Sequence, residues 1–270
     1  MNARELLQKV ESWPADNIAA ALITPQGVET SGDTSRRFEV ASVTKLVVAY
    51  AIMLAVEEGV VELDQAAGPE GSTLRHLLAH ASGIPFDSRE PQKKVGERRI
   101  YSSAGYEWAA DVVAAAAGMD FADYLQEGLC KPLGMTRTSL EGSAGHGLVS
   151  TVDDLVVFAQ EVLEPKLLHS STVEEMRTIQ FPELRGVVPG YGGYNPCPWG
   201  LGFEIRGDKT PHWTGENMPA ETIGHFGVSG TYLWIAESLA MVALTDHPFG
   251  DWAKPLWSDT NTAIWAGLHE

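Results

Sequence analysis

Ser42 and Lys45 are the two residues whose types and spacing could carry out chemistry. They stand three positions apart at the start of an apolar run, Leu46 to Val56. On a helix, residues i and i+3 share one face, so the lysine nitrogen would lie within reach of the serine hydroxyl. A serine hydroxyl is a poor nucleophile at neutral pH until an adjacent base takes its proton. The pair therefore predicts an activated serine nucleophile.

The sequence around this pair supports the same interpretation. The run from Leu46 to Val56 is apolar on every side, which is typical of a buried central helix. A lysine at the start of such a helix needs a partner, because an unpaired buried charge is costly. Ser42 would also lie at the positive end of the helix dipole, which stabilises a developing alkoxide. The alternative is a serine N-cap followed by a lysine whose ammonium reaches solvent.

Two further segments contain candidate site residues. Tyr101 precedes an alanine-rich helical stretch, and a tyrosine with a lowered pKa can act as a general base toward Ser42. The segment His225-Phe226-Gly227-Val228 lies on a predicted strand, where glycine often marks the close approach of another backbone or of a ligand. Such a strand edge would lend a backbone N–H to an oxyanion hole. A half-buried tyrosine and a simple glycine-rich hairpin are the alternatives.

Other catalytic arrangements do not match the sequence. His76 and His80 have the spacing of metal ligands on a helix, but Leu77 stands where a zinc motif has glutamate, and no other His/Cys cluster supports a metal. The Gly-x-Ser-x-Gly elbow of α/β-hydrolases does not occur. Cys130 and Cys197 are expected to be free thiols. We therefore expect no metal and no other cofactor.

The composition limits the partners. The chain has 270 residues, of which 44% are hydrophobic and 20% charged, enough for one large domain or two intimate subdomains. The net charge of −17 argues against nucleic acid and anionic membranes, because a phosphate-binding face needs a basic stripe. The sequence has neither an apolar secretory segment at its start nor an apolar run of membrane-spanning length. A cytoplasmic location is expected, whereas the oligomeric state is not indicated.

The elements that would position these residues follow from hydrophobic and turn patterns. Strands are expected over residues 18–28, 36–40, 199–206, 222–228, 232–236 and 240–246. Helices are expected over residues 42–58, 72–79, 103–117, 121–130, 150–163 and 251–268. Strands at both ends with helices between them predict an α/β fold of the α+β type, in which one antiparallel sheet with flanking helices receives an inserted, mostly helical lobe. The expected subdomains are 1–64 with 199–270 for the sheet, and 65–198 for the lobe.

Three short motifs, in this order and at these separations, resemble those of the penicillin-recognising serine hydrolases: Ser42-Val43-Thr44-Lys45, Tyr101-Ser102-Ser103 and His225-Phe226-Gly227. This superfamily contains class C β-lactamases, D,D-peptidases and related esterases. Further landmarks of the superfamily are similar to residues 74–85, 132–135 and 147–155. The resemblance runs from about Phe38 to about Asp246, and its weight comes from the ordered co-occurrence of the motifs.

The resemblance implies a β-lactamase/transpeptidase-like fold, with the active site between the sheet and the helical lobe. It implies an acyl-serine mechanism in which Ser42 attacks a carbonyl group while Lys45 and Tyr101 move its proton. The backbone N–H groups of Ser42 and Val228 would form the oxyanion hole, and water would release the acyl group. The residues implied to bind the substrate are Ser103, His225, Phe226 and Gly227.

Two departures from the family pattern affect the expected substrate. Ser103 stands where the family usually has asparagine, and His225 stands where it often has lysine. A histidine with an ordinary pKa near ~6.5 is mostly neutral at neutral pH, so it attracts a substrate carboxylate poorly. We therefore expect a hydrolase of a small ester or amide. The alternatives are a β-lactamase or D-amino-acid peptidase similar to penicillin-binding proteins, and a non-catalytic ligand-binding member of the fold.

Overall fold

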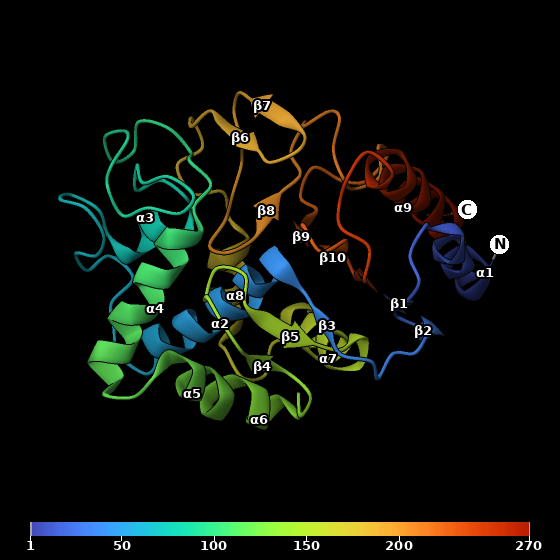
Figure 1. Ribbon diagram of the computed structural model, residues 1–270, viewed down its shortest axis with the longest axis horizontal. Coiled ribbons are helices and arrows are strands. Elements are labelled where there is room, and N and C mark those ends of the chain that lie inside the picture. The colour runs from blue at the N-terminus through green and yellow to red at the C-terminus, as the bar shows by residue number, and fades with distance from the viewer. Residues whose placement is uncertain (1, 270) are drawn as a thin grey trace.

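A six-stranded antiparallel sheet forms the centre of the computed structural model, which describes residues 2–269 (Figure 1). The strand order is β2-β1-β11-β10-β9-β8. The strands are β1 (Ile18–Thr24), β2 (Gly27–Gly32), β8 (Glu204–Ile205), β9 (Ile223–Gly227), β10 (Thr231–Ala236) and β11 (Leu239–Thr245). Strands from both ends of the chain thus build one antiparallel sheet, as predicted.

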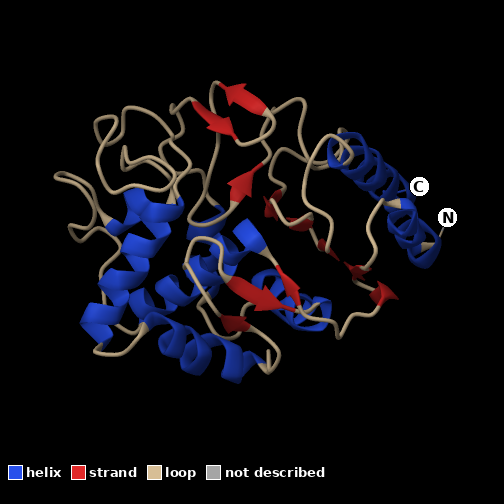
Figure 2. Cartoon of the chain, in the orientation of Figure 1, coloured by secondary structure: helices blue, strands red, loops and turns tan. Residues whose placement is uncertain are grey.

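The two faces of this sheet pack against separate hydrophobic cores. In β1, Ala19, Ala21 and Ile23 face the core that contains α2 (Thr44–Glu57) and α7 (Val152–Leu163). The residues between them, Ala20 and Leu22, face the core formed with α1 (Ala3–Leu7) and α9 (Ala253–His269). Because successive strand residues point to opposite faces, a strand covered on both sides is apolar throughout. Figure 2 shows these helices on either side of the strands.

The remaining elements lie around α2 and near the edge of the sheet formed by β8. The helices are α3 (Leu74–Leu78), α4 (Ser103–Ala117), α5 (Phe121–Leu125), α6 (Lys131–Leu133) and α8 (Ser170–Arg177), with a 3₁₀ helix at η1 (Gln8–Ser12) and a π-helical turn at η3 (Gln126–Cys130). There are two further small sheets. One has three strands in the order β3 (Phe38–Glu39), β5 (Leu148–Ser150) and β4 (Ser139–Leu140), and the other pairs β6 (Gly186–Val188) with β7 (Gly192–Tyr194). The division into two subdomains stays a prediction. Among residues 2–269, no helix is both long and apolar enough to cross a membrane.

The segment that contains Ser42 differs from the expected single helix. Residues 44–55 are all buried, as the apolar run predicts. However, Ser42 lies on a preceding 3₁₀ turn, η2 (Ala41–Val43), and α2 begins only at Thr44. Such turns are frequent at helix N-termini because they satisfy backbone groups that the first helical turn leaves free.

Two predicted strands also differ from the structure. Residues 36–40 contribute only β3, which pairs with β5 and not with the large sheet. The strand expected over 199–206 is reduced to β8, because the chain turns at Gly202 with φ of +93°. A Cβ atom at Gly202 would lie 2.4 Å from the Cβ of Ala49 on α2. This close passage over α2 prevents extended pairing before Glu204.

Candidate active site

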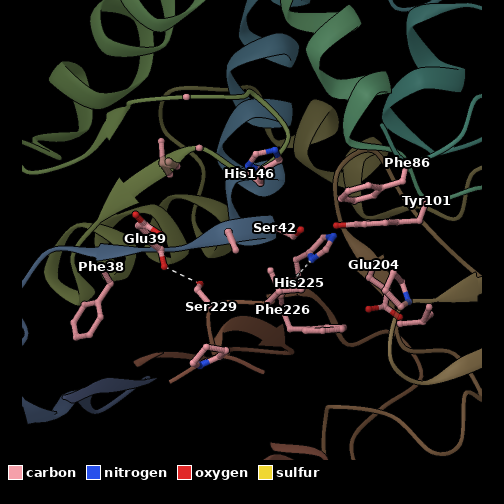
Figure 3. A pocket seen from close by; sticks show the side chains of 18 of the residues that line it. Phe38, Glu39, Ser42, Phe86, Tyr101, His146, Glu204, His225, Phe226 and Ser229 are labelled. Carbon is pink, nitrogen blue, oxygen red and sulfur yellow. Dashed lines mark hydrogen bonds between the residues drawn. The ribbon is translucent and has the colours of Figure 1, made fainter. Parts of the chain in front are cut away.

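A cleft of about 1510 Å³ contains Ser42 in its wall (Figure 3). Its lining comes from the edge of β9, from β3 and β5, and from loops near residues 85–101 and 187–189. Of the predicted site residues, the cleft is lined by Ser42, Tyr101, His225, Phe226 and Val228. Segments far apart in the sequence therefore meet at one site.

The 3₁₀ turn and the start of α2 bring Ser42 and Lys45 together. The Lys45 Nζ donates to the Ser42 Oγ over 3.4 Å, which agrees with the predicted i, i+3 contact. Ala41, directly before the serine, has a φ of 45°, a left-handed conformation that is uncommon for a residue with a side chain. This backbone turn presents Ser42 to the cleft, and the lysine approaches the serine from within the protein.

Lys45 is completely buried and has three oxygen acceptors. Besides Ser42, its Nζ donates to the Ser103 Oγ over 3.1 Å and to the Gly145 carbonyl over 2.8 Å. Burial lowers the pKa of Lys45 to about 7, while the Glu107 carboxylate acts in the opposite direction. Desolvation favours the neutral amine, so Lys45 can accept a proton near neutral pH.

Tyr101 lies next to this pair and does not have the lowered pKa that we expected. Its hydroxyl points toward Ser42 in Figure 3, and its ring lies under the Lys45 ammonium, 4.5 Å from the ring centroid. Burial among aromatic rings raises the pKa of Tyr101, and the interaction with the Ser42 side chain opposes this only in part. The sequence cannot indicate the direction of this pKa shift, since the shift depends on how deeply the folded chain buries Tyr101. Tyr101 is therefore a neutral phenol beside the serine.

Ser103 is buried behind Lys45 at the start of α4. The preceding residue, Ser102, caps this helix, because its Oγ accepts from the Gly105 N–H over 2.9 Å and donates to the Pro85 carbonyl over 2.6 Å. This cap fixes the backbone between Tyr101 and Ser103. The Ser103 hydroxyl faces the lysine, whereas the sequence interpretation placed it against the substrate.

Gly145 is a site residue that the sequence interpretation missed. It lies 100 residues from Lys45, so no local spacing relates the two. The only signal in the sequence is the clustering of small residues in Gly142-Ser143-Ala144-Gly145, just before a segment that resembles a family landmark.

Gly227 explains how β9 approaches the nucleophile turn. A Cβ atom at this position would lie 2.5 Å from the Val40 carbonyl oxygen and 2.9 Å from the Ala41 Cβ. This close contact agrees with the expectation that glycine in this strand marks the approach of another backbone. It places Val228, which is 63% exposed, at the cleft. The role of the Ser42 and Val228 amides as an oxyanion hole stays a prediction.

His225 is buried in the cleft wall and is more strongly held in its neutral form than expected. Its Nδ1 lies 2.7 Å from the Phe226 carbonyl oxygen, which assigns the proton to Nδ1 and leaves Nε2 as an acceptor. Nε2 has no partner within residues 2–269. Burial lowers the pKa of His225 to about 4, and Lys45 adds to this effect. The ordinary pKa that we assumed for His225 is therefore wrong.

The remaining candidates have separate local contacts. His76 packs on Phe181 and contacts Thr73, whereas the His80 Nδ1 accepts from the Ser102 N–H over 3.1 Å. No group of three or more His, Cys, Asp or Glu residues in the described chain is arranged to hold a metal ion. Cys130 and Cys197 are both free and buried.

Comparisons with known proteins agree with this fold. The family profile described as Beta-lactamase matches residues 24–254. The crystal structure of a β-lactamase from Mycobacterium bovis is 49% identical and covers 97% of this chain and 98% of its own, with a TM-score of 0.95. The simvastatin synthase of Aspergillus terreus shares the fold at 18% identity, covering 99% of this chain and 98% of its own, with a TM-score of 0.79.

Similarity to curated sequences is more limited in extent. Penicillin-binding protein 4* of Bacillus subtilis is 28% identical over an alignment of 138 positions, and the match covers 39% of this chain and 31% of that protein. The chain thus spans about a third of the length of the curated relatives that it matches first. With the profile matched over most of its length, the chain belongs to the β-lactamase family, within the serine hydrolase superfamily.

Proposed function

We propose that this protein hydrolyses a small, largely apolar ester or amide through an acyl-serine intermediate on Ser42. The observation that carries the proposal is the buried Lys45, whose pKa is about 7 and whose nitrogen contacts the Ser42 hydroxyl. A neutral amine in this position can remove the serine proton as the hydroxyl attacks.

The proposed reaction has two stages. In the first, the Ser42 Oγ bonds to the carbonyl carbon, its proton passes to the Lys45 Nζ, and the leaving group departs with a proton delivered through the Tyr101 hydroxyl. The Ser42 and Val228 N–H groups would stabilise the negative charge on the carbonyl oxygen. In the second stage, water attacks the acyl carbon and loses a proton to the same residues, which pass it to the Ser42 Oγ as the bond between that oxygen and the acyl carbon breaks and the acid is released.

The apolar character of the cleft supports an apolar substrate. Phe86, Val187 and Val228 are 50%, 44% and 63% exposed, and all three line the cleft. Apolar side chains exposed around one cavity are typical of a ligand-binding groove. His225 adds no positive charge, because its pKa is about 4. An uncharged acyl group therefore fits this wall better than a carboxylate.

The test is covalent labelling with a fluorophosphonate probe, followed by mass spectrometry of the adduct. We expect the label on Ser42, and we expect Ser42→Ala to abolish both labelling and hydrolysis of p-nitrophenyl esters. Ser229→Ala is the matched control, since Ser229 also lines the cleft, and it should still be labelled. Labelling of a different serine in the wild-type protein would refute the assignment, and an unlabelled protein would support the non-catalytic binding alternative.

One observation favours a second candidate, a β-lactamase or D-amino-acid peptidase. Arg98 is half-buried and lines the cleft, and no carboxylate pairs with it within residues 2–269. Its guanidinium would attract a substrate carboxylate. Hydrolysis of a chromogenic cephalosporin faster than of any p-nitrophenyl ester, with a selective loss in Arg98→Ala, would favour this candidate.

A further inference from the structure

A chain of hydrogen bonds connects α4 to Lys45 through the loop between Gly142 and Gly147. The Ser143 hydroxyl donates to the Glu107 carboxylate on α4. The Ser143 Oγ in turn accepts from the Gly145 N–H over 3.0 Å. The Gly145 carbonyl then accepts from the Lys45 Nζ over 2.8 Å. Glu107 therefore lies at one end of the chain and the proposed base at the other.

The loop reaches Lys45 because two small residues meet there. A Cβ atom at Gly145 would lie 2.6 Å from the Ser103 Cβ and 2.9 Å from the Ser103 Oγ. The backbone of the loop thus packs directly on the first turn of α4. Neither Glu107 nor Ser143 lines the cleft, so both act on the lysine from behind and without contact to a substrate.

Glu107 is also the charged group that acts most directly on Lys45. The other titratable groups around the lysine are Tyr101, Tyr106, His80 and His225. Burial raises the pKa of both tyrosines and lowers the pKa of both histidines, so all four are neutral near pH 7.

Two other buried charged groups near the site have hydrogen-bond or ion-pair partners of their own. Glu204 lies beyond His225 and pairs with Lys209 over 3.1 Å and with His212 over 3.0 Å. The buried Arg99 guanidinium donates to backbone carbonyls. Glu107 makes no ion pair among the described residues.

We propose that Glu107 is a positioning residue that holds Lys45 against Ser42 through Ser143 and Gly145 and stabilises the lysine in its charged form. The inference rests on the proposed function, in which Lys45 takes the serine proton. When that proton arrives, an ammonium ion forms in a buried site, and the Glu107 carboxylate offsets part of the cost of that charge. The same carboxylate opposes the effect of burial on the pKa of Lys45.

The experiment compares pH profiles of kcat and KM on a p-nitrophenyl ester for three variants. Glu107→Gln keeps an oxygen acceptor for Ser143 but removes the charge. We expect its acid limb to move to lower pH by about 0.3 unit or more, and its plateau kcat to fall about threefold or more. Ser143→Ala keeps the Glu107 charge but removes the hydrogen bonds that connect Glu107 to Gly145. Its kcat should therefore fall, while the acid limb of its pH profile should stay at the wild-type pH. KM should stay within about twofold in both, since neither side chain touches the cleft.

Glu127→Gln is the matched control, because Glu127 is an exposed carboxylate on η3 that pairs with Lys131. It should reproduce the wild-type profile. If Glu107→Gln also does so, the proposal is overturned. If Glu107→Gln does not fold, Glu107→Asp and Ser143→Ala decide the question, and unchanged kcat in both would refute the positioning role.

A readout without substrate separates this proposal from the proposed function. In protein labelled with ¹³C-lysine, the Lys45 signal is assigned by its loss in Lys45→Met, and its titration is followed by NMR. A lower pKa in Glu107→Gln supports the inference even if no ester is hydrolysed. An unchanged titration overturns the inference even if Ser42 is labelled and active.

Discussion

Ser103 and Gly145 together show how the lysine is held without the asparagine that is usual in the family. The hydroxyl of Ser103 and the carbonyl of Gly145 both accept from the Lys45 Nζ, over 3.1 and 2.8 Å. The smaller residue at position 103 leaves the space that the loop backbone occupies. We therefore do not expect an asparagine at position 103 to improve the site.

The variant Ser103→Asn tests this pairing. The longer side chain must displace the Gly145 backbone or leave its rotamer minimum, and overpacking in a buried site is destabilising. We expect kcat on a p-nitrophenyl ester to fall by about tenfold or more, and more than in Ser103→Ala, which removes one acceptor without adding bulk. An Asn variant that is faster than the wild type would contradict the steric argument.

The distance between β9 and η2 controls the geometry around Ser42. Gly227 permits this distance, since any Cβ there would overlap the Val40 carbonyl and the Ala41 side chain. We expect Gly227→Ala to push the strand away, to lower kcat by about a hundredfold and to reduce the free energy of unfolding by about 1–3 kcal/mol.

Gly193→Ala on β7 is a suitable control for this prediction. The nearest atom to a Cβ atom there is 3.8 Å away, which is an ordinary van der Waals contact. Kinetics and thermal unfolding of both variants measure the two effects. Full activity in Gly227→Ala would show that the strand position is not critical.

Some of these elements could be predicted from the sequence, and others could not. The apolar run after Lys45 predicted a buried helix, and the helix over residues 103–117 has the predicted bounds. The 3₁₀ turn at Ser42 and the loss of most of the strand before Glu204 depend on contacts with distant parts of the chain.

The candidate site was predictable to a similar extent. The i, i+3 spacing predicted the contact between Ser42 and Lys45. The contact with Gly145 joins residues 100 positions apart, and the direction of the Tyr101 pKa shift depends on burial, which has no local pattern. Local spacing thus predicts contacts within an element, whereas solvation is a property of the folded chain.

Buried neutral histidines make the stability of the whole fold depend on pH. Burial lowers the pKa of His225 to about 4 and that of His80 well below its ordinary value of 6.5. In the unfolded chain both would titrate near ~6.5. Between that pH and the folded-state values the unfolded chain binds more protons, so stability falls as the pH decreases.

We expect the thermal unfolding temperature to decrease steadily from pH 7 to pH 5. Each such histidine contributes at most about 1.4 kcal/mol per pH unit in this window. His225→Gln should make the dependence shallower, whereas His247→Gln, at an exposed position, should leave it unchanged. Differential scanning calorimetry provides the measurement. Parallel curves for wild type and His225→Gln would show that His225 is not buried in its neutral form.

The placement of Ser42 on η2 and of Lys45 on α2, in one continuous buried segment, has a consequence for how such a protein diversifies. A substitution in that segment affects folding and turnover at the same time, because its residues belong to the core. The cleft walls near Phe86, His146 and Val187 lie outside the long helices, where sequence changes are better tolerated. Selection can therefore replace the surfaces that recognise the substrate while the bond-forming residues stay fixed, and new specificities can arise without a new catalytic centre.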